Sequence, residues 1–161
     1  MGSVDGLDSR LLLALSRNPR ATVVSLADAV SASRNTVHAR LSRMERDGTL
    51  RSFEHRVDPA GLGYPLTAFV LVVVTQRQLD QVGEAFAKIP EILEVTGISG
   101  ATDLLVRVAG RDADHLYRIA ARILATDGVE RTEVSLAMRQ LVPYRVLPLL
   151  ESMTAEAPAE P

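Results

Sequence analysis

The stretch Ser33–Gly48, SRNTVHARLSRMERDG, has the pattern of one amphipathic helix with defined ends. Ser33 can cap the first turn, and Gly48 follows the last turn, where glycine adopts a left-handed conformation at little cost. One apolar stripe repeats at intervals of four and three residues and consists of Val37, Leu41 and Met44. The opposite side is short, polar and poor in acid, and it contains Asn35, His38, Ala39, Ser42 and Arg46, with Arg34, Arg40 and Arg43 on its flanks. Such a helix suits the major groove of DNA, and an ordinary amphipathic helix with a solvated face fits this stretch alone equally well.

Two shorter helical patterns precede this stretch. The first begins at Leu7-Asp8 and stops at Asn18-Pro19, because proline cannot continue a helix. Thr22 can cap the second, and the three residues 31–33 then form a tight turn into the third helix. This order is typical of a helix-turn-helix, whose last helix enters the groove of DNA. A plain three-helix bundle is the alternative, and the short turn and the arginines disfavour it.

Composition and charge restrict the class of protein. The chain has 161 residues, 47% of them apolar, which is enough for one domain or two small ones with a real core. It has no cysteine, and its longest apolar run, Ala68–Val74, is far below the roughly 20 residues of a membrane span. The N-terminus lacks the pattern of a signal peptide, so we expect a cytoplasmic protein without a membrane partner. Net charge is +3 through Val57 and −5 beyond it, which fits a phosphate-facing module joined to an acidic one.

A segment rich in glycine and proline, residues 58–65, follows a short strand-like segment, Leu50–Val57, and we interpret it as a hinge. The apolar period changes after it and predicts the order βαββαβ. The expected strands are 66–74, 92–99, 104–109 and 129–138, and the expected helices are 79–89 and 112–126. This order is the ferredoxin-like arrangement, an antiparallel sheet with both helices on one side. The sequence therefore predicts an α+β protein with domains at residues 1–57 and 66–150 and a disordered tail at 151–161.

The first predicted strand, LTAFVLVVV at 66–74, is apolar on both of its faces. An antiparallel sheet with one wet face would alternate apolar and polar residues. Two helices cover only one face, so we predict a homodimer in which a second copy covers the other. The apolar segment Leu141–Leu150 is interrupted by Pro143 and Pro148, and we expect it to pack on the domain or on a neighbouring subunit.

Several short motifs occur in an order and spacing that are together specific. They are Leu7-Asp8, Leu26-Ala27, Ser33, Thr36-Val37, Arg40, Arg43, Glu45, Gly48, Asp58-Pro59 and Ser99–Asp103. On these residues the chain resembles the Lrp/AsnC family of feast/famine transcription regulators, from Leu7 to about Leu150. The resemblance implies an N-terminal winged helix-turn-helix and a C-terminal ligand-sensing domain that dimerises through its sheet and often assembles further, for example into octamers. One departure is Ser31, at a turn position where the family usually has glycine.

Two sets of site residues follow, one from the polar face of the stretch Ser33–Gly48 and one implied by the resemblance. We expect double-stranded DNA to contact Ser33, Arg34, Asn35, Thr36, His38, Arg40, Ser42 and Arg43, with Arg40 and Arg43 on phosphates. The resemblance implies that an effector, an amino acid or a similar small molecule, lies near Ile98, Ser99, Gly100, Ala101, Thr102 and Asp103, with Thr132, Val134 and Ser135 on the last strand. Thr132 and Ser135 fit ordinary strand positions equally well. Gly100 would let the backbone approach a carboxylate, while Asp103 would either pair with an α-ammonium group or hold the loop.

Catalysis and metal binding have little support. The three histidines, His38, His55 and His115, form no metal-ligand pair, and no glycine-rich phosphate loop follows a strand. Glu91 and Glu94 are interpreted as solvated rather than as an acid pair. The sequence therefore predicts a DNA-binding regulator that responds to an amino acid or a similar small molecule, and no enzyme. The alternative is a non-sensing architectural protein that wraps or bends DNA through oligomerisation.

Overall fold

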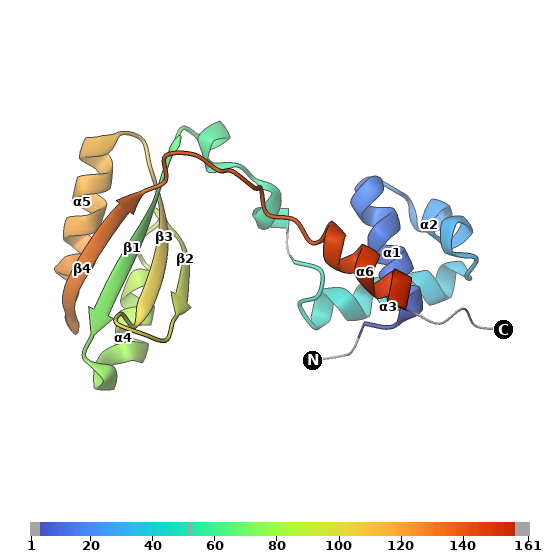
Figure 1. Cartoon of the computed structure of the whole chain (residues 1–161), viewed down its shortest axis with the longest axis horizontal. Helices are drawn as coiled ribbons and strands as arrows, with labels where there is room; N and C mark the ends of the chain where they lie inside the picture. The colour runs from blue at the N-terminus through green and yellow to red at the C-terminus, as the bar shows by residue number, and fades with distance from the viewer. Residues whose placement is uncertain (1–3, 52, 157–161) are drawn as a thin grey trace. The chain divides into compact units, whose positions relative to one another are not determined.

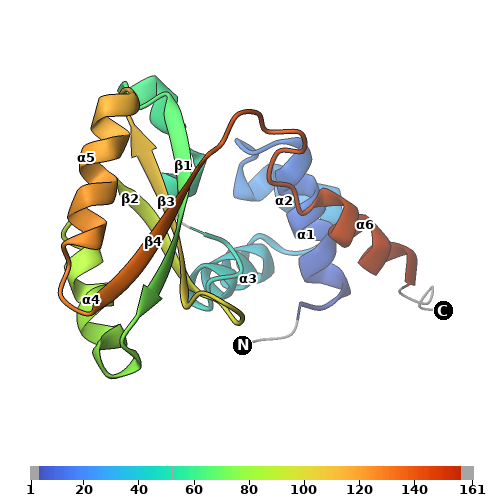
Figure 2. The same ribbon diagram turned by 60° about the vertical axis from the view of Figure 1, so that its left-hand side comes forward.

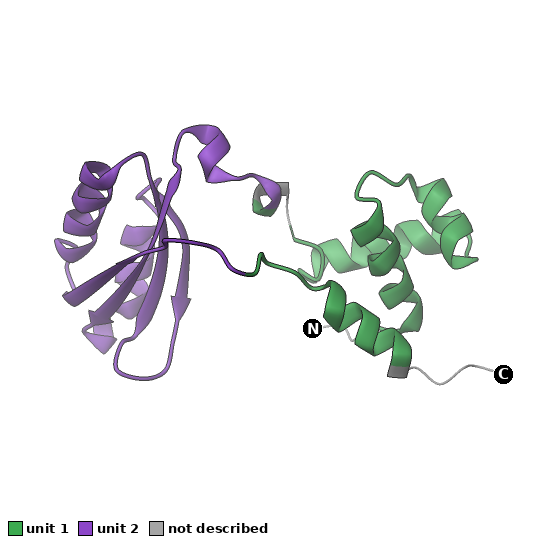
Figure 3. Ribbon diagram, turned by 45° about the horizontal axis from the view of Figure 1, so that its top comes forward, with its two compact units in different colours: residues 1–55, 142–161 green, residues 56–141 purple. Residues whose placement is uncertain are grey.

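The computed structural model describes residues 4–51 and 53–156. The chain divides into two compact units (Figure 3). One unit is formed by Met1–His55 together with Val142–Pro161, and the other by Arg56–Leu141. The C-terminal segment thus belongs to the same unit as the N-terminal helices. In the described residues, no helix is both long and apolar enough to cross a membrane.

The N-terminal unit is helical, and each of its first three helices begins at a side-chain cap. The helices are α1 (Gly6–Arg17), α2 (Val23–Val30), α3 (Arg34–Arg46) and α6 (Leu147–Glu156). The caps are Asp5, Thr22 and Ser33, each of which accepts a hydrogen bond from a backbone N–H three residues on. One face of each of α1, α2 and α3 supplies the core, whose members are Leu11, Leu26, Ala27, Val30, Val37 and Met44. The predicted helix-turn-helix order is confirmed.

The turn between α2 and α3 departs from ordinary backbone geometry at one residue. Ser31 has φ 56° and ψ 46°, in the left-handed region, and it is the one described non-glycine residue with positive φ. Its backbone N–H donates to the Asp28 carbonyl, and the Ala32 N–H donates to the Ala27 carbonyl. Serine therefore occupies a conformation that glycine adopts more cheaply.

Two expectations for the N-terminal unit are wrong. The segment Leu50–Val57 contains a 3₁₀ helix, η1 (Phe53–Arg56), and not a strand, while Ser52 lies outside the described residues. A lone strand in this helical unit would have no partner for its backbone groups. Residues 151–156 belong to α6 and are not a disordered tail, whereas residues 157–161 lie outside the described part of the chain. Pro148 is tolerated because it stands in the first turn of α6, where its missing N–H has no partner to lose.

Helix α6 lies beside α1 in both Figure 1 and Figure 2. Leu150 of α6 is buried. The broken apolar segment at the end of the chain therefore contributes a fourth helix to the N-terminal unit.

The second unit is an antiparallel sheet with the strand order β2-β3-β1-β4. Its strands are β1 (Leu66–Val74), β2 (Ile92–Gly97), β3 (Leu104–Gly110) and β4 (Val129–Leu136). Two helices, α4 (Leu79–Phe86) and α5 (Ala113–Leu124), cover one face (Figures 1 and 2). Short 3₁₀ helices η2 (Pro59–Leu62) and η3 (Gln76–Gln78) flank β1. The predicted βαββαβ fold is confirmed, with β2 and β4 each ending two residues earlier than expected.

The two faces of β1 have different environments. Ala68, Val70, Val72 and Val74 are buried against α4 and α5 in the core of this unit. The alternate residues point to the open face, where Phe69 and Leu71 lie opposite Arg107 and Leu105 of β3. Phe69 is exposed and Leu71 half-buried. The open face therefore carries an apolar strip along β1.

Glu91, which we expected to be solvated, lies immediately before β2 and is paired. Its carboxylate accepts hydrogen bonds from His115 Nε2 at 3.2 Å and from Arg122 Nη1 at 3.1 Å. Burial alone would raise the pKa of Glu91, but its own backbone N–H, His115 and the charge of Arg122 outweigh burial and lower that pKa. This carboxylate ties α5 to the edge of the sheet.

Candidate functional site

The first turn of α3 is organised by two hydroxyl side chains. Ser33 Oγ accepts a hydrogen bond from the Thr36 backbone N–H at 3.1 Å and lies 2.8 Å from Thr36 Oγ1. The remaining N–H groups of this turn and the positive end of the helix dipole are available to an anion.

The polar face of α3 is exposed as the helical period predicts. Arg34, Asn35 and His38 are exposed, and Ser42 is half-buried. Arg46, which the predicted site set omitted, is also exposed on this face, about one turn beyond Ser42. The side chains that could reach base edges thus lie opposite the buried Val37 and Met44.

Arg40 and Arg43 lie in a different environment, because both contact acidic residues of the α1 start. Arg40 Nη1 lies 3.1 Å from Asp8 Oδ1 and also contacts Asp5, while Arg43 Nη2 contacts Asp8 Oδ2. The Asp8 side chain is 0% exposed, whereas Arg40 and Arg43 are 30% and 34% exposed. The hydrogen bond from Arg40 holds the pKa of the Asp5 carboxyl below its usual value. The two arginines expected on phosphates therefore bridge α3 to α1.

The predicted effector loop, residues 98–103, connects β2 to β3 and is held by Asp103. Asp103 Oδ2 accepts from the Val74 N–H at 2.9 Å, and Oδ1 accepts from Gln76 Nε2 at 2.7 Å. The Ile98 N–H donates to the Asp103 carbonyl. Of the two roles considered for Asp103, the structure shows the one that holds the loop.

The tip of this loop is accessible. Ser99, Gly100 and Ala101 are exposed, while Ile98, Thr102 and Asp103 are half-buried. Gly100 has φ +130°, a conformation that side chains rarely adopt. The tip therefore offers backbone groups to a ligand, on a base that Asp103 fixes.

The three predicted effector residues of β4 do not share one face. Thr132 and Val134 lie opposite Val72 and Val70 of β1, on the helix-covered side of the sheet. Ser135 lies opposite Phe69, on the open side. A ligand on one face of β4 within this chain can therefore contact only part of the predicted set.

Comparisons with known proteins match both units. The model of the Lrp/AsnC ligand binding domain matches residues 67–147, and a winged helix-turn-helix DNA-binding model matches residues 4–51. The chain belongs to the Lrp/AsnC family. An HTH-type transcriptional regulator of Mycobacterium tuberculosis is 31% identical over 143 residues, which cover 88% of this chain and 97% of that protein. This Lrp/AsnC protein is therefore a DNA-binding transcriptional regulator with a ligand-binding domain, and its family is not one of enzymes.

Solved structures show the same fold. AsnC of E. coli superimposes with a TM-score of 0.79 at 23% identity, over 91% of this Lrp/AsnC chain and all of that one. The feast or famine regulatory protein of M. tuberculosis, solved in complex with L-methionine, has a TM-score of 0.77 at 26% identity, over 89% of this chain and 97% of that one. The second relative binds an amino acid.

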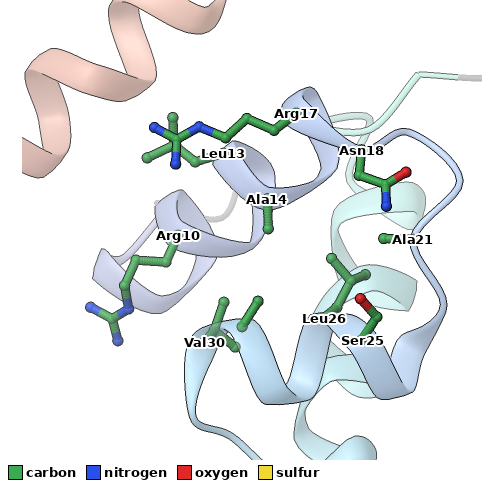
Figure 4. A pocket seen from close by; sticks show the side chains of 10 residues that line it. Arg10, Leu13, Ala14, Arg17, Asn18, Ala21, Ser25, Leu26 and Val30 are labelled. Carbon is green, nitrogen blue, oxygen red and sulfur yellow. The ribbon is translucent and has the colours of Figure 1, made fainter.

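A pocket of about 360 Å³ lies between α1 and α2 (Figure 4). Its lining is apolar at Leu13, Ala14, Leu26 and Val30, with Arg10 and Arg17 extending from α1. It contains none of the residues predicted to bind DNA or effector. Among the residues that the structure describes, no three histidine or acidic side chains are grouped to hold a metal ion.

Sequence reasoning omitted two residues of functional interest in this regulator. Arg46 had a signal, because its position in the helical period places it among the exposed polar residues. Asp8 was noted as part of the Leu7-Asp8 motif, but nothing in the sequence pointed to its pairing with arginines that lie 32 and 35 residues away in the chain.

Proposed function

We propose that this regulator reads a palindromic operator as a dimer, through one α3 helix from each copy, and that an amino acid bound near residues 98–103 alters its assembly or its affinity for DNA. The observation that carries the proposal is the exposed polar face of α3, which is capped by Ser33 and backed by the buried Val37 and Met44. Half-sites would then lie about one helical turn of DNA, or a multiple of it, apart.

Base reading is assigned to the exposed part of α3. The amide of Asn35 and the imidazole of His38 can pair with base edges, with Ser42 beside them and Ser33, Arg34 and Thr36 at the phosphate end. Asn35→Ala or His38→Ala should cost about 1–3 kcal/mol on the preferred site and relax preference at one base pair. Gln81→Ala on α4, an exposed polar residue far along the chain, is the matched control. If neither substitution changes the affinity for a duplex selected from a random pool, the assignment is wrong.

Dimer formation is assigned to the open face of the sheet. The support is the apolar strip of Phe69 and Leu71, which the helices of this unit leave uncovered. Phe69→Glu with Leu71→Glu should produce monomers or insoluble protein, measured by light scattering. Gln81→Glu on the helix-covered side should leave the dimer intact. If the doubly substituted chain forms a soluble dimer, the proposal is wrong. Light scattering of the unsubstituted protein would also show whether dimers assemble into octamers.

An amino-acid effector is supported by two observations. The relative from M. tuberculosis is complexed with L-methionine, and the accessible backbone around Gly100 can receive a carboxylate. A thermal-shift scan of the twenty amino acids should raise the melting temperature for at least one, because a ligand of the native state stabilises it. The same amino acid should change oligomer size or DNA affinity. No shift with any of them would favour an architectural protein, or an effector of another class.

A further inference from the structure

The arginines of α3 fall into two classes. Arg34 and Arg46 are exposed and make no ion pair with any residue that the structure describes. Arg40 and Arg43 are two-thirds buried and converge on one carboxylate, that of Asp8. Residues of the same type on the same helix therefore have different surroundings, and different functions are expected of them.

Asp8 is fixed by hydrogen bonds to Asp5, Arg40 and Arg43. It is the third residue of α1 and forms a reciprocal capping box with Asp5, in which the Asp5 N–H donates to Asp8 Oδ2 at 3.1 Å and the Asp8 N–H donates to Asp5 Oδ1 at 2.9 Å. Its other oxygen, Oδ1, accepts from Arg40. The positive end of α1 favours this negative charge. Asp8 is thus a buried carboxylate whose two oxygens both accept hydrogen bonds.

Helical geometry places Arg40 and Arg43 off the reading face. At about 100° per residue, they lie with Asp47 on the flank between the buried stripe and the exposed face. Arg43 also approaches Asp47, with Nη1 at 3.9 Å from Oδ2. The two arginines together with Asp5 and Asp8 sum to zero charge, so this group adds little long-range attraction for DNA.

Resting on the DNA-binding role proposed above, we propose that Arg40 and Arg43 are positioning residues. They lock α3 to the start of α1 through Asp8 and do not serve as phosphate ligands. Moving either guanidinium to a phosphate would take a cation from a buried carboxylate, and an uncompensated buried charge is strongly unfavourable. Arg34 and Arg46 then supply the phosphate attraction of this helix, and the lock sets the angle at which Asn35 and His38 meet the bases.

The salt dependence of binding distinguishes the two roles. The full-length chain is titrated with the best duplex from a random-pool selection, and with a duplex of mixed sequence, over a range of salt concentrations. Arg46→Gln should reduce the slope of log affinity against log salt by about 0.9 for each helix that loses a phosphate contact. Arg40→Gln and Arg43→Gln should weaken the selected duplex about tenfold or more while the slope stays unchanged.

Asp8→Asn tests the lock from its other side. An aspartate cannot attract phosphate, so a loss of selected-site affinity similar to that of Arg43→Gln supports a positioning role. The double variant Asp8→Asn/Arg43→Gln should lose no more affinity than the weaker-binding single variant, because both changes break the same interaction. A slope that falls with Arg40→Gln or Arg43→Gln, together with tighter DNA binding by Asp8→Asn, would overturn the proposal.

Asp5→Asn keeps the experiment decisive if Asp8→Asn does not fold. Asparagine caps helices as well as aspartate, so α1 is retained while Arg40 loses its exposed partner. With Asp8 still holding Arg40, affinity and slope should stay unchanged. A steeper slope would show that Arg40 had been released to phosphate, and the proposal would be wrong.

Failure of the lock and failure of the proposed DNA-binding role give different results. An unsubstituted chain that binds neither duplex contradicts the proposed role. The lock is then read from thermal unfolding, where Asp8→Asn and Arg43→Gln should lower the melting temperature without additivity and Arg46→Gln should not. Additive effects of the two would overturn the lock.

Discussion

Both units of this protein have an apolar core, but they differ in the polar residues that they bury. The sheet unit has an apolar interior, in which the valines of β1 and β3 meet Phe86 of α4 and the isoleucines of α5. The buried polar residues that the structure describes, Asp8 and Ser9, both belong to α1 of the N-terminal unit. Apolar burial is non-directional, whereas a charged hydrogen bond requires one geometry. The sheet unit is therefore held by packing that is not directional. In the N-terminal unit, the charged hydrogen bonds of Asp8 also fix the orientation of α3 relative to α1.

The largest test removes the centre of the apolar interior. Phe86→Ala should cost about 3–5 kcal/mol in the unfolding free energy of the sheet unit, since it empties a fully buried site. Tyr117→Ala, at an exposed aromatic on α5, should stay within about 0.5 kcal/mol. Hydrogen exchange should show the loss in β1 and β3. An equal loss in α1–α3 would mean that the two units unfold as one, and the contrast between them would not hold.

A second test concerns the C-terminal helix. Leu150 of α6 is 7% exposed and its neighbour Leu149 is 65% exposed. Leu150→Ala should lower stability by about 2–3 kcal/mol, while Leu149→Ala should have little effect. Exchange protection should fall in α1, against which α6 packs. If protection were lost in β1 instead, the assignment of α6 to the N-terminal unit would be wrong.

A third substitution should stabilise the N-terminal unit. Ser31→Gly relieves the left-handed conformation in the turn before α3, which should raise stability by about 0.5–1 kcal/mol after the entropy of glycine is included. Ser25→Gly, inside α2, should instead destabilise by about 0.5 kcal/mol. Thermal midpoints of the two variants would therefore move in opposite directions. A lower midpoint for Ser31→Gly would show that the serine side chain contributes more than the backbone strain costs.

The smallest effect concerns the loss of stability of the sheet unit as the pH is lowered. The folded-state pKa of Glu91 is lower than its usual 4.5, so its pairing with His115 and Arg122 stabilises the fold above that value and is lost as pH falls through the folded pKa. Glu91→Gln should remove this part of the pH dependence, about 0.5 kcal/mol. Unfolding midpoints at neutral and acid pH measure it, with Glu94→Gln as the exposed control. If Glu91→Gln leaves the loss of stability at acid pH unchanged, other carboxylates are responsible for it.

Much of the fold was predictable because its signals are local. Ser33 and Thr22 cap helices where their positions predict, and Leu66–Val74 is a strand with two apolar faces. The errors occur where local pattern and environment disagree. Leu50–Val57 alternates like a strand but has no partner, and Pro148 interrupts the apolar run but stands in the first turn of α6. The candidate loop came from the family resemblance of Ser99–Asp103. Neighbouring residues of a strand face opposite sides, but which face Val134 and Ser135 each occupy was decided only by the register of β4 on β1.

The sequence by itself determined the helices, the strands and the polar face of α3, because helical and strand periods and caps depend on residues a few positions apart. The two apolar faces of the strand Leu66–Val74 also led to the prediction that a second copy of the chain covers the face away from α4 and α5. Only the tertiary structure decided which arginines of α3 are paired. Asp8 meets Arg40 and Arg43 across 32 and 35 residues of chain, and no local pattern encodes a contact that exists only once α1 and α3 have packed.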